Sequence, residues 1–432
     1  MCRKTLSILL FIVVSPICRA QQITTPYVSD TQGITFQELG RTALARNKEI
    51  EAAHESLRQA EARLTQARLR PNPSLEVSRT TDVMFGNEGD TAFSVTYSQP
   101  LELGGKRSKR ISVEQAGIQV TKAEIADKER VLIGELRSLY VQALGAASRV
   151  DLFDRLTALN QQMVSVMDVR LRAGDASRLD ARLLAAETNQ VRAQRLVAAN
   201  QLAGTILQIR AVAGYSPIEP LLLKRPLSPA DMLESEETAV TRALENRPDL
   251  EAARLREELA DAGITLAKSQ AVPTPTAFAR YGRESVPIVT TAGQRIAFDQ
   301  ENVMEFGVSL PLPFFNREQG NIAEAASKRA QARSEREALE IAIRREVVLA
   351  YRRFTTARQT LDILQTGVIQ PNQESFQIVQ LAYRLGEMRL LDIVNQQRVV
   401  VEAETSYTDA QTEFNAALAA LELAMGTVTG PY

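Results

Sequence analysis

The sequence predicts a mainly α protein with a small β part, in which long coiled-coil helical hairpins are combined with four β-strands. Three observations support this fold class: an internal duplication, long proline-free stretches with heptad-like apolar spacing, and two pairs of alternating strands. The 432 residues are 44% hydrophobic and 24% charged, with a formal net charge of -1. This composition describes a water-compatible chain and argues against a polytopic helical membrane protein.

The first twenty residues have the pattern of a secretion signal. Two basic residues precede an apolar run at residues 6–14, and Ala20 supplies the small residue before the expected cleavage point. A lipoprotein alternative would place Cys18 first in the mature chain, but Ile17 is not the small residue that this processing requires. The other cysteine, Cys2, also lies in this segment, which suits an oxidising compartment.

The rest of the chain is an internal duplication. Residues 43–53 recur as residues 243–253, and the paired prolines at 71 and 73 recur at 273 and 275. The displacement grows further along the chain, so the inserted residues lie in one hairpin, as expected of an exposed loop. The expected organisation is a signal peptide (1–20), an N-terminal segment (21–34), a first repeat (35–213), a linker (214–235), a second repeat (236–426) and a C-terminal tail (427–432).

Each repeat is predicted to form a helix, a β-hairpin, a very long helix, a tight turn and a second long helix. In the first repeat, residues 36–69 predict one helix, which Pro71 ends. No proline occurs between Pro100 and Pro217, and Gly174 is the natural turn in this span. The pattern therefore predicts a helix of about 65 residues followed by one of about 38.

The apolar spacing in the long helices is that of a coiled coil, with steps of four and three in alternation. The two seams are Leu132, Leu136, Leu139, Ala143, Ala146, Val150 and Phe153, and Val347, Ala350, Phe354, Ala357, Leu361, Leu364 and Val368. The alternative is an apolar stripe that faces a globular core. The length of the helices favours coiled packing.

Four strands are predicted, at residues 74–82, 91–98, 276–283 and 303–310. Apolar and polar residues alternate along them, as in the strands of an outer-membrane barrel. The alternative is a pair of soluble hairpins that cap a coiled coil. Four strands cannot close a membrane barrel, and open edges are not stable in lipid. Three copies of the chain would supply twelve strands.

With these features, the chain resembles the TolC-type outer membrane factor family over the whole mature sequence. Two stretches, residues 99–107 (QPLELGGKR) and 310–320 (LPLPFFNREQG), are similar to the heavy-metal cation-efflux (CzcC-like) branch. The resemblance implies a homotrimer with a twelve-stranded barrel in outer-membrane lipid and a twelve-helix α-barrel in the periplasm. It also implies a periplasmic adaptor and an inner-membrane RND-type pump as partners, and a conduit rather than an enzyme, with no cofactor.

The resemblance further implies that the two helix turns contact the adaptor. The residues expected there are Arg170, Leu171, Arg172, Gly174, Asp175 and Ser177 in the first turn, and Leu385, Gly386, Glu387 and Met388 in the second.

The resemblance also places a gate next to these turns. Asp392 matches the acidic constriction of the family, and Asn395 replaces a second acid that relatives carry three residues on. Asp180 and Tyr383 match a hydrogen-bonded latch, but the arginine position of that latch is occupied by Met388. The remaining candidates for the arginine are Arg384 and Arg389. The alternative interpretation is that Asp392 and Asp180 only stabilise helix N-termini.

The functional expectation is an exit duct of a tripartite efflux system in the outer membrane, with a large periplasmic extension, passing heavy-metal cations. The alternatives are a duct for drugs, small organic compounds or secreted polypeptides, and a periplasmic coiled-coil scaffold whose hairpins never enter lipid. His54 has no cysteine or second histidine with which to form a soft-metal site. Nucleic-acid binding is disfavoured by the near-zero net charge. Four of residues 106–110 are basic. They are either solvent-exposed charges at the start of a helix or residues that contact anionic lipid headgroups.

Overall fold

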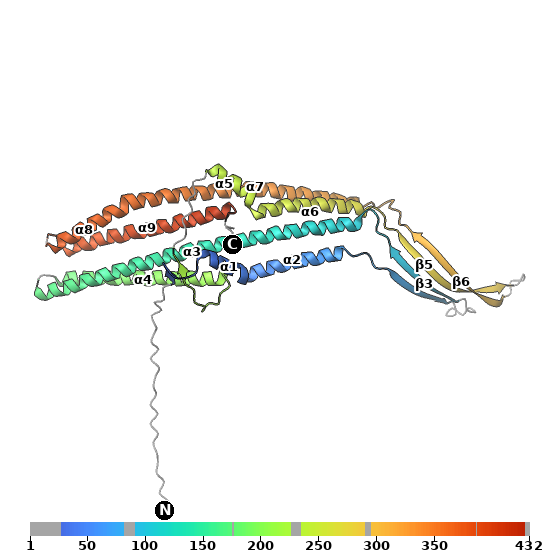
Figure 1. Ribbon diagram of the computed structural model, residues 1–432, viewed down its shortest axis with the longest axis horizontal. Helices are drawn as coiled ribbons and strands as arrows, with labels where there is room; N and C mark the ends of the chain where they lie inside the picture. The colour runs from blue at the N-terminus through green and yellow to red at the C-terminus, as the bar shows by residue number, and fades with distance from the viewer. Residues whose placement is uncertain are drawn as a thin grey trace, which may run out of the picture.

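The computed structural model shows an elongated helical body with a β-sheet that projects from one end (Figure 1). It describes residues 27–81, 91–174, 177–225, 235–289, 295–385 and 387–427. The signal peptide and most of the C-terminal tail therefore lie outside the described residues. The mainly α class with a small β part is confirmed.

The elements follow the predicted repeat. The N-terminal segment contains β1 (Val28–Ser29) and the linker contains β4 (Leu223–Lys224). The first repeat contains α1 (Phe36–Arg46), α2 (Lys48–Ala67), β2 (Ser74–Thr81), β3 (Thr91–Pro100), α3 (Lys106–Ala173) and α4 (Arg178–Val212). The second contains α5 (Glu236–Asn246), α6 (Pro248–Gln270), β5 (Thr276–Val289), β6 (Arg295–Ser309), α7 (Gln319–Leu364), a π-helical turn (Gln365–Ile369), α8 (Gln370–Arg384) and α9 (Leu390–Ala424).

The single helix predicted for residues 36–69 is wrong, because the chain breaks at Asn47. This residue has extended backbone angles, and its side-chain oxygen accepts from the amides of Glu49 and Ile50 at 2.7 and 3.2 Å, which starts α2 as an N-cap. Its Nδ2 donates to the carbonyl of Val212 at 2.9 Å, at the end of α4. The break therefore ties α1 and α2 to a helix that is distant in the sequence.

The second repeat has the same break with different chemistry. Arg247 lies between α5 and α6, and its guanidinium donates to the carbonyl of Ala424 at 3.1 Å, at the end of α9. Arg130, from α3, donates to the neighbouring carbonyl of Leu423 at 2.8 Å. Two buried arginines thus satisfy the end of α9, where helical carbonyls lack intrahelical partners.

The long helices agree with the predicted lengths: α3 has 68 residues and α4 has 35. The predicted seam of α3 is buried or half-buried, and so is the seam predicted from Val347 to Val368. The π-helical turn interrupts the helix after Leu364. Pro371 lacks an amide hydrogen and its ring crowds the carbonyl of Gly367, so the extra residue per turn relieves the conflict.

The core lies at mid-length, where the short helices cover the long ones. One cluster joins α1, α3, α4 and β4, and a second joins α5, α7 and α9. Tyr140 is buried in the first, and its hydroxyl donates to the carbonyl of Lys224 at 2.6 Å. Burial raises the pKa of Tyr140 to about 12. The linker strand is thereby fixed to the longest helix.

The four long strands form one antiparallel sheet in the order β2-β3-β5-β6. The predicted strands exist, but β5 and β6 are longer than expected, at 14 and 15 residues. Pro287 lies outside the predicted strands, at residues 276–283 and 303–310, but in the structure it belongs to β5, opposite Phe298. The last residue of β5 that pairs with β3 is Glu284, and Pro287 lies beyond it. On the side of β5 that faces β3, the amide hydrogen that proline lacks is therefore not needed for a hydrogen bond. The turns at 82–90 and 290–294 lie outside the described residues.

One face of the sheet is apolar and exposed. The register places Val77, Val95, Tyr281 and Met304 in one row across the four strands. The next row towards the helices holds Leu75, Tyr97, Ala279 and Phe306. The opposite face carries polar rows, such as Glu76, Thr96, Arg280 and Glu305. The sheet is therefore two-sided, and its edge strands are β2 and β6.

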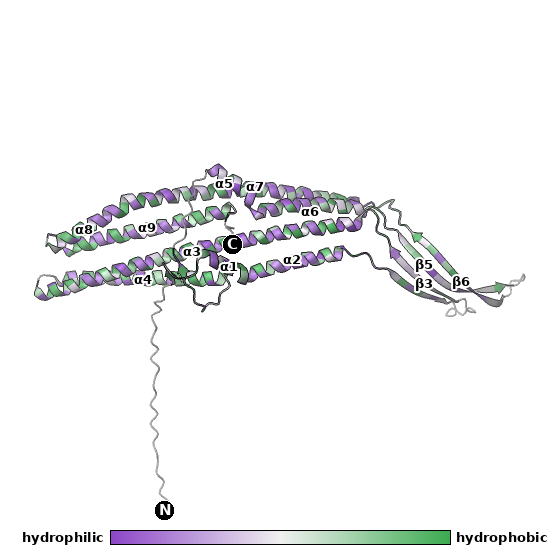
Figure 2. Cartoon of the chain, in the orientation of Figure 1, coloured by the Kyte–Doolittle hydropathy of each residue, from purple (hydrophilic) through white to green (hydrophobic). Residues whose placement is uncertain are grey.

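Among the described residues, no helix is both long enough and apolar enough to cross a membrane. Figure 2 shows hydrophilic and hydrophobic residues mixed along the helices.

Candidate functional site: the hairpin tips and the groove above them

The two helix turns lie together at the end of the body farthest from the sheet (Figure 1). In the first, Gly174 ends α3 with a φ of 82°, a left-handed conformation that glycine adopts without strain. The hydroxyl oxygen of Ser177 then accepts from the amide of Leu179 at 3.1 Å and starts α4. Arg172 is exposed and Leu171 is half-buried. Asp175 lies outside the described residues.

The second turn presents apolar side chains to solvent. Leu385 and Met388 are exposed, and the amide of Glu387 donates to the carbonyl of Ala382 at 2.9 Å. Gly386 and the side chain of Arg384 lie outside the described residues. The expected adaptor-contact residues that the structure describes thus form one tip of mixed apolar and basic character.

Asp392 lies in the first turn of α9 and is exposed. Its Oδ2 accepts from the backbone amide of Arg389 at 2.9 Å, and a carboxylate at a helix N-terminus is favoured by the helix dipole. Asn395 is also exposed, one helical turn further on, while Ile393 and Val394 are buried. Asp392 therefore has a capping role in the chain and still presents its charge to solvent. Asp180 lies in the corresponding first turn of α4 and is half-buried.

Tyr383 makes a contact that the sequence did not predict. The guanidinium carbon of Arg170, at the end of α3, lies 5.0 Å from the centre of the Tyr383 ring, at the end of α8. This cation–π contact joins the two hairpin tips. Within one chain, the described residues form no hydrogen bond between Asp180 and Tyr383.

A small apolar cluster holds the tips together beneath this contact. Met167 and Leu184, from the first hairpin, are buried against Leu390 and Val394, from the second, and Tyr383 packs against them. Separating the two tips would expose this cluster, so burial of apolar surface holds them together in addition to the cation–π contact.

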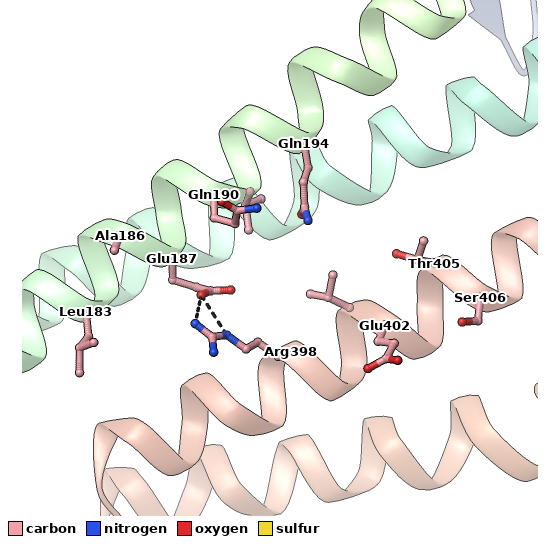
Figure 3. Close-up of a pocket in the computed structure, with 11 residues that line it drawn as sticks. Leu183, Ala186, Glu187, Gln190, Gln194, Arg398, Glu402, Thr405 and Ser406 are labelled. Carbon is pink, nitrogen blue, oxygen red and sulfur yellow. Dashed lines mark hydrogen bonds and ion pairs between the residues drawn. The ribbon is translucent and has the colours of Figure 1, made fainter.

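Above the tips, a groove of about 680 Å³ separates α4 from α9 (Figure 3). Glu187 of α4 and Arg398 of α9 bridge it, with Arg398 donating to Glu187 Oε2 at 2.8 and 3.1 Å. Gln190, Gln194 and Glu402 line the same groove. The two hairpins are thus linked by an ion pair across this groove.

A buried amide pair lies between α3 and α9. The Nε2 of Gln397 donates to the Oδ1 of Asn160 at 2.6 Å, and the two residues are 1% and 0% exposed. Asn160 Nδ2 and Gln397 Oε1 have no hydrogen-bond partner among the residues that the structure describes. Such a pair is costly to separate, because either half left alone would be buried and unpaired. It fixes the register of the two hairpins.

Further ion pairs continue along the same interface. Arg155 pairs with Glu404, Arg149 with Asp409, and Arg137 with Glu422. Burial raises the pKa of Glu422, and the charge of Arg137 opposes that shift. The seam between α3 and α9 is therefore electrostatic along most of its length.

Among the described residues, no group of three or more His, Cys, Asp or Glu side chains is placed to hold a metal ion. His54 lies beside Glu129, with Nε2 at 3.6 Å from the carboxylate, and both are partly exposed.

Sequence reasoning missed Arg170 as the partner of Tyr383, and missed the pairs that cross the groove. These partners are more than 200 residues apart, so local spacing carries no sign of them. One signal was available. Glu187 and Arg398 occupy nearly equivalent positions in the two repeats, and opposite charges at such positions indicate that the equivalent helices face each other.

The comparisons with known proteins agree with this geometry. A family model described as outer membrane efflux protein matches residues 39–215 and 239–427. The cobalt-zinc-cadmium resistance protein CzcC of Cupriavidus metallidurans is 25% identical over 379 residues, covering 87% of this chain and 85% of the relative. The pyoverdine export outer membrane protein OpmQ of Pseudomonas putida is 25% identical over 420 residues, covering 89% and 84%.

The fold also has solved relatives. The crystal structure of the channel CusC superposes with a TM-score of 0.72 at 16% identity, covering 93% of each chain. A duplicated helical body that carries a two-sided sheet thus defines an outer-membrane channel. The chain belongs to the outer membrane efflux protein family. The expected resemblance and the outer-membrane location are confirmed.

Proposed function

We propose that the protein is the exit duct of a tripartite efflux system and passes heavy-metal cations out of the cell. The observation that carries this proposal is the sheet, which has one exposed apolar face, one polar face and two open edges, β2 and β6. An apolar outer face and a polar inner face are what a membrane channel requires.

Closure of the sheet requires other copies of the chain. The edge strands would leave unpaired amides and carbonyls in lipid, which is not stable. Three copies supply twelve strands and pair β6 of each chain with β2 of the next. The long helices of the three chains would then enclose a periplasmic tunnel. In this arrangement the hairpin tips point away from the membrane, where an adaptor and an inner-membrane pump would meet them.

The proposed cargo rests on similarity and on charge. CzcC is named for resistance to cobalt, zinc and cadmium. A ring of three Asp392 side chains at the tips would concentrate cations and repel anions. Small organic compounds are the second candidate, because OpmQ is named for export of pyoverdine.

Deletion of the gene, followed by growth on a panel of divalent metals and organic toxicants, tests the cargo. We expect lost tolerance to one or more metals, restored by the wild-type gene and not by an Asp392→Arg variant that reaches the membrane at wild-type level. Unchanged metal tolerance beside lost tolerance to organic compounds would favour the second candidate. Recovery of the protein in the soluble periplasmic fraction would favour a scaffold and contradict the duct.

A further inference from the structure

The apolar surface of the sheet does not end where the strands end. The amide of Leu101 donates to the carbonyl of Pro275 at 2.8 Å, which continues the pairing of β3 with β5 one step further. By the alternation of β6, Leu310 falls in the same row, and both leucines are exposed. A further apolar row thus extends towards the helices.

The segment after β6 continues this pattern with larger side chains. Leu312 and Phe314 are exposed, the latter by 68%, and Phe315 is 95% exposed. Pro311 and Pro313 keep the backbone extended between them and remove amide donors that would otherwise need partners. An exposed phenylalanine pair of this kind, joined to an apolar face, marks an interaction surface.

The length of the apolar band indicates what covers it. On the apolar face, the outer boundary is the row that contains Arg79, Arg283 and Asn302. From Met304 to Val308 the strand rises only about 13 Å, or about 10 Å along the membrane normal at a tilt near 40°. The hydrocarbon band of an outer membrane is about 25 Å tall. From Met304 to Leu312 the chain rises about 26 Å along the strand, or about 20 Å along the membrane normal. A turn follows, in which the amide of Phe314 donates to the carbonyl of Leu312 at 2.9 Å. The apolar band therefore reaches about the height of the hydrocarbon at the segment that holds Phe314 and Phe315.

We propose that the segment Leu310–Phe315 is a membrane anchor that lies in the periplasmic leaflet of the outer membrane, with Phe314 and Phe315 at the boundary between acyl chains and headgroups. This inference rests on the proposed insertion of the sheet in lipid. Phe93 and Tyr281 lie at or next to the outer boundary of the band, so aromatic side chains mark both of its borders.

The charges next to the anchor agree with an anionic lipid surface. Arg317 is exposed two residues after Phe315, and Lys109 is exposed at the start of α3. Neighbouring Arg107 and Arg110 have another role, because they donate to the carbonyls of Arg68, Ala67 and Leu69 at the end of α2. Lys106 donates to the hydroxyl of Thr274 at 2.6 Å. Among residues 106–110, the choice between solvated charge and headgroup contact therefore concerns Lys109.

Tryptophan fluorescence tests the anchor, because the chain contains no tryptophan. Four single variants are reconstituted in vesicles of phosphatidylethanolamine and phosphatidylglycerol: Phe314→Trp, Phe315→Trp, Phe306→Trp on the apolar face, and Leu196→Trp on the exposed surface of α4. Each is exposed to brominated phospholipid and, separately, to aqueous iodide. We expect bromolipid quenching and a blue-shifted emission for the first three variants, and iodide quenching only for Leu196→Trp.

The outcomes separate this inference from the proposed function. Bromolipid quenching of Phe306→Trp, with iodide quenching of Phe314→Trp and Phe315→Trp, would overturn the anchor and leave the membrane sheet intact. Quenching of the two anchor variants by neither agent would mean that a second copy of the chain covers the segment, which also overturns it. Iodide quenching of Phe306→Trp would overturn the proposed insertion itself.

Discussion

At the scale of single residues, the contact between Arg170 and Tyr383 depends on the aromatic ring and not on its hydroxyl, because the guanidinium carbon lies 5.0 Å from the ring centre. Tyr383→Phe should therefore leave closure nearly unchanged, whereas Tyr383→Leu and Arg170→Gln should weaken it. An exposed cation–π contact contributes about 0.5–1 kcal/mol, or about two- to fivefold in the closed population of each chain. Open probability in planar bilayers measures the effect.

Arg172→Gln is the matched control, because Arg172 is exposed and lies two residues from Arg170 in the same turn. It should behave as wild type. If Tyr383→Phe opens the channel as much as Tyr383→Leu, the hydroxyl is required, and the hydrogen-bonded latch with Asp180 becomes the better account.

The cluster at the end of α9 should make the protein sensitive to acid. Burial would raise the pKa of Asp249, but hydrogen bonding to Arg247 and its charge lower it more, so the pKa lies below its ordinary value. A carboxylate with a lowered folded-state pKa stabilises the protein above the unfolded pKa of about 4, and this contribution is lost as pH falls below it. We expect the melting temperature to fall more steeply below about pH 4 in wild type than in Asp249→Asn.

Circular dichroism at 222 nm, in detergent and across a series of pH values, measures this melting temperature. Asp249→Asn should start from a lower melting temperature at neutral pH, because it leaves the buried Arg247 with one partner fewer. Glu258→Gln, an exposed carboxylate on the same helix, is the control and should keep the wild-type slope. A parallel fall in wild type and Asp249→Asn would exclude Asp249 as the acid-sensitive group.

At the scale of elements, the sequence allowed prediction of the helices and strands that a repeating pattern marks. The α3 seam and the turn at Gly174 follow from periodicity and from one glycine. The break at Asn47 was hidden because strong helix formers surround it, and because the bond from its Nδ2 to the carbonyl of Val212, at the end of α4, forms only in the folded chain. The added length of β5 and β6 was hidden because Pro287 is normally a strand breaker, and only the staggered sheet makes it acceptable.

The same limit applies to the candidate site. The turn residues were predictable from the two glycines and the repeat. The pairs Asn160 with Gln397 and Arg170 with Tyr383 were not, because they form only after two hairpins from different repeats pack together. These contacts depend on which residues of the two long helices lie side by side. A shift of one helix by a single residue would separate the partners.

Glycines at two positions in the first repeat should respond to alanine in opposite ways. Gly104 has a φ of 70°, and a Cβ there would meet the side chain of Val272 at 2.9 Å, so Gly104→Ala combines strain with a clash. Gly117 lies inside α3, and a Cβ there would meet nothing within 4 Å. We expect Gly104→Ala to destabilise by about 1–3 kcal/mol and Gly117→Ala to stabilise by about 0.5–1 kcal/mol.

Thermal unfolding followed by circular dichroism distinguishes the two variants, and each serves as the control for the other. Destabilisation by Gly117→Ala would mean that this face of α3 is covered in the assembled protein, most simply by a second chain. A neutral Gly104→Ala would show that the junction between β3 and α3 can shift without cost, and that the strand end is not held in the position described.

At the scale of the whole molecule, the duplication predicts how neighbouring chains pair. Within one chain, β3 of the first repeat pairs with β5 of the second, for example Ser98 opposite Phe278. The equivalent contact between chains joins β6 of one to β2 of the next. Pro73, before β2, corresponds to Pro275, before β5, and Pro100, at the end of β3, corresponds to Pro311, after β6. When the register of β3 with β5 is transferred through these equivalent prolines, Val77 of one chain lies opposite Val308 of the neighbouring chain. Both residues lie on the apolar face, so this register joins the faces without a break.

Directly opposed residues in an antiparallel pair have Cα atoms about 4.5–5.5 Å apart, a distance that a disulfide can span. The double variant Val77→Cys and Val308→Cys should therefore give covalent trimers on oxidation, seen on a non-reducing gel and lost with reductant. Val77→Cys with Ser309→Cys is the matched control, because a shift of one residue turns the second cysteine to the other face. Efficient crosslinking of Val77→Cys to Phe306→Cys or Leu310→Cys instead would place the neighbouring strand two residues away, and the two interfaces of the repeat would then not be equivalent.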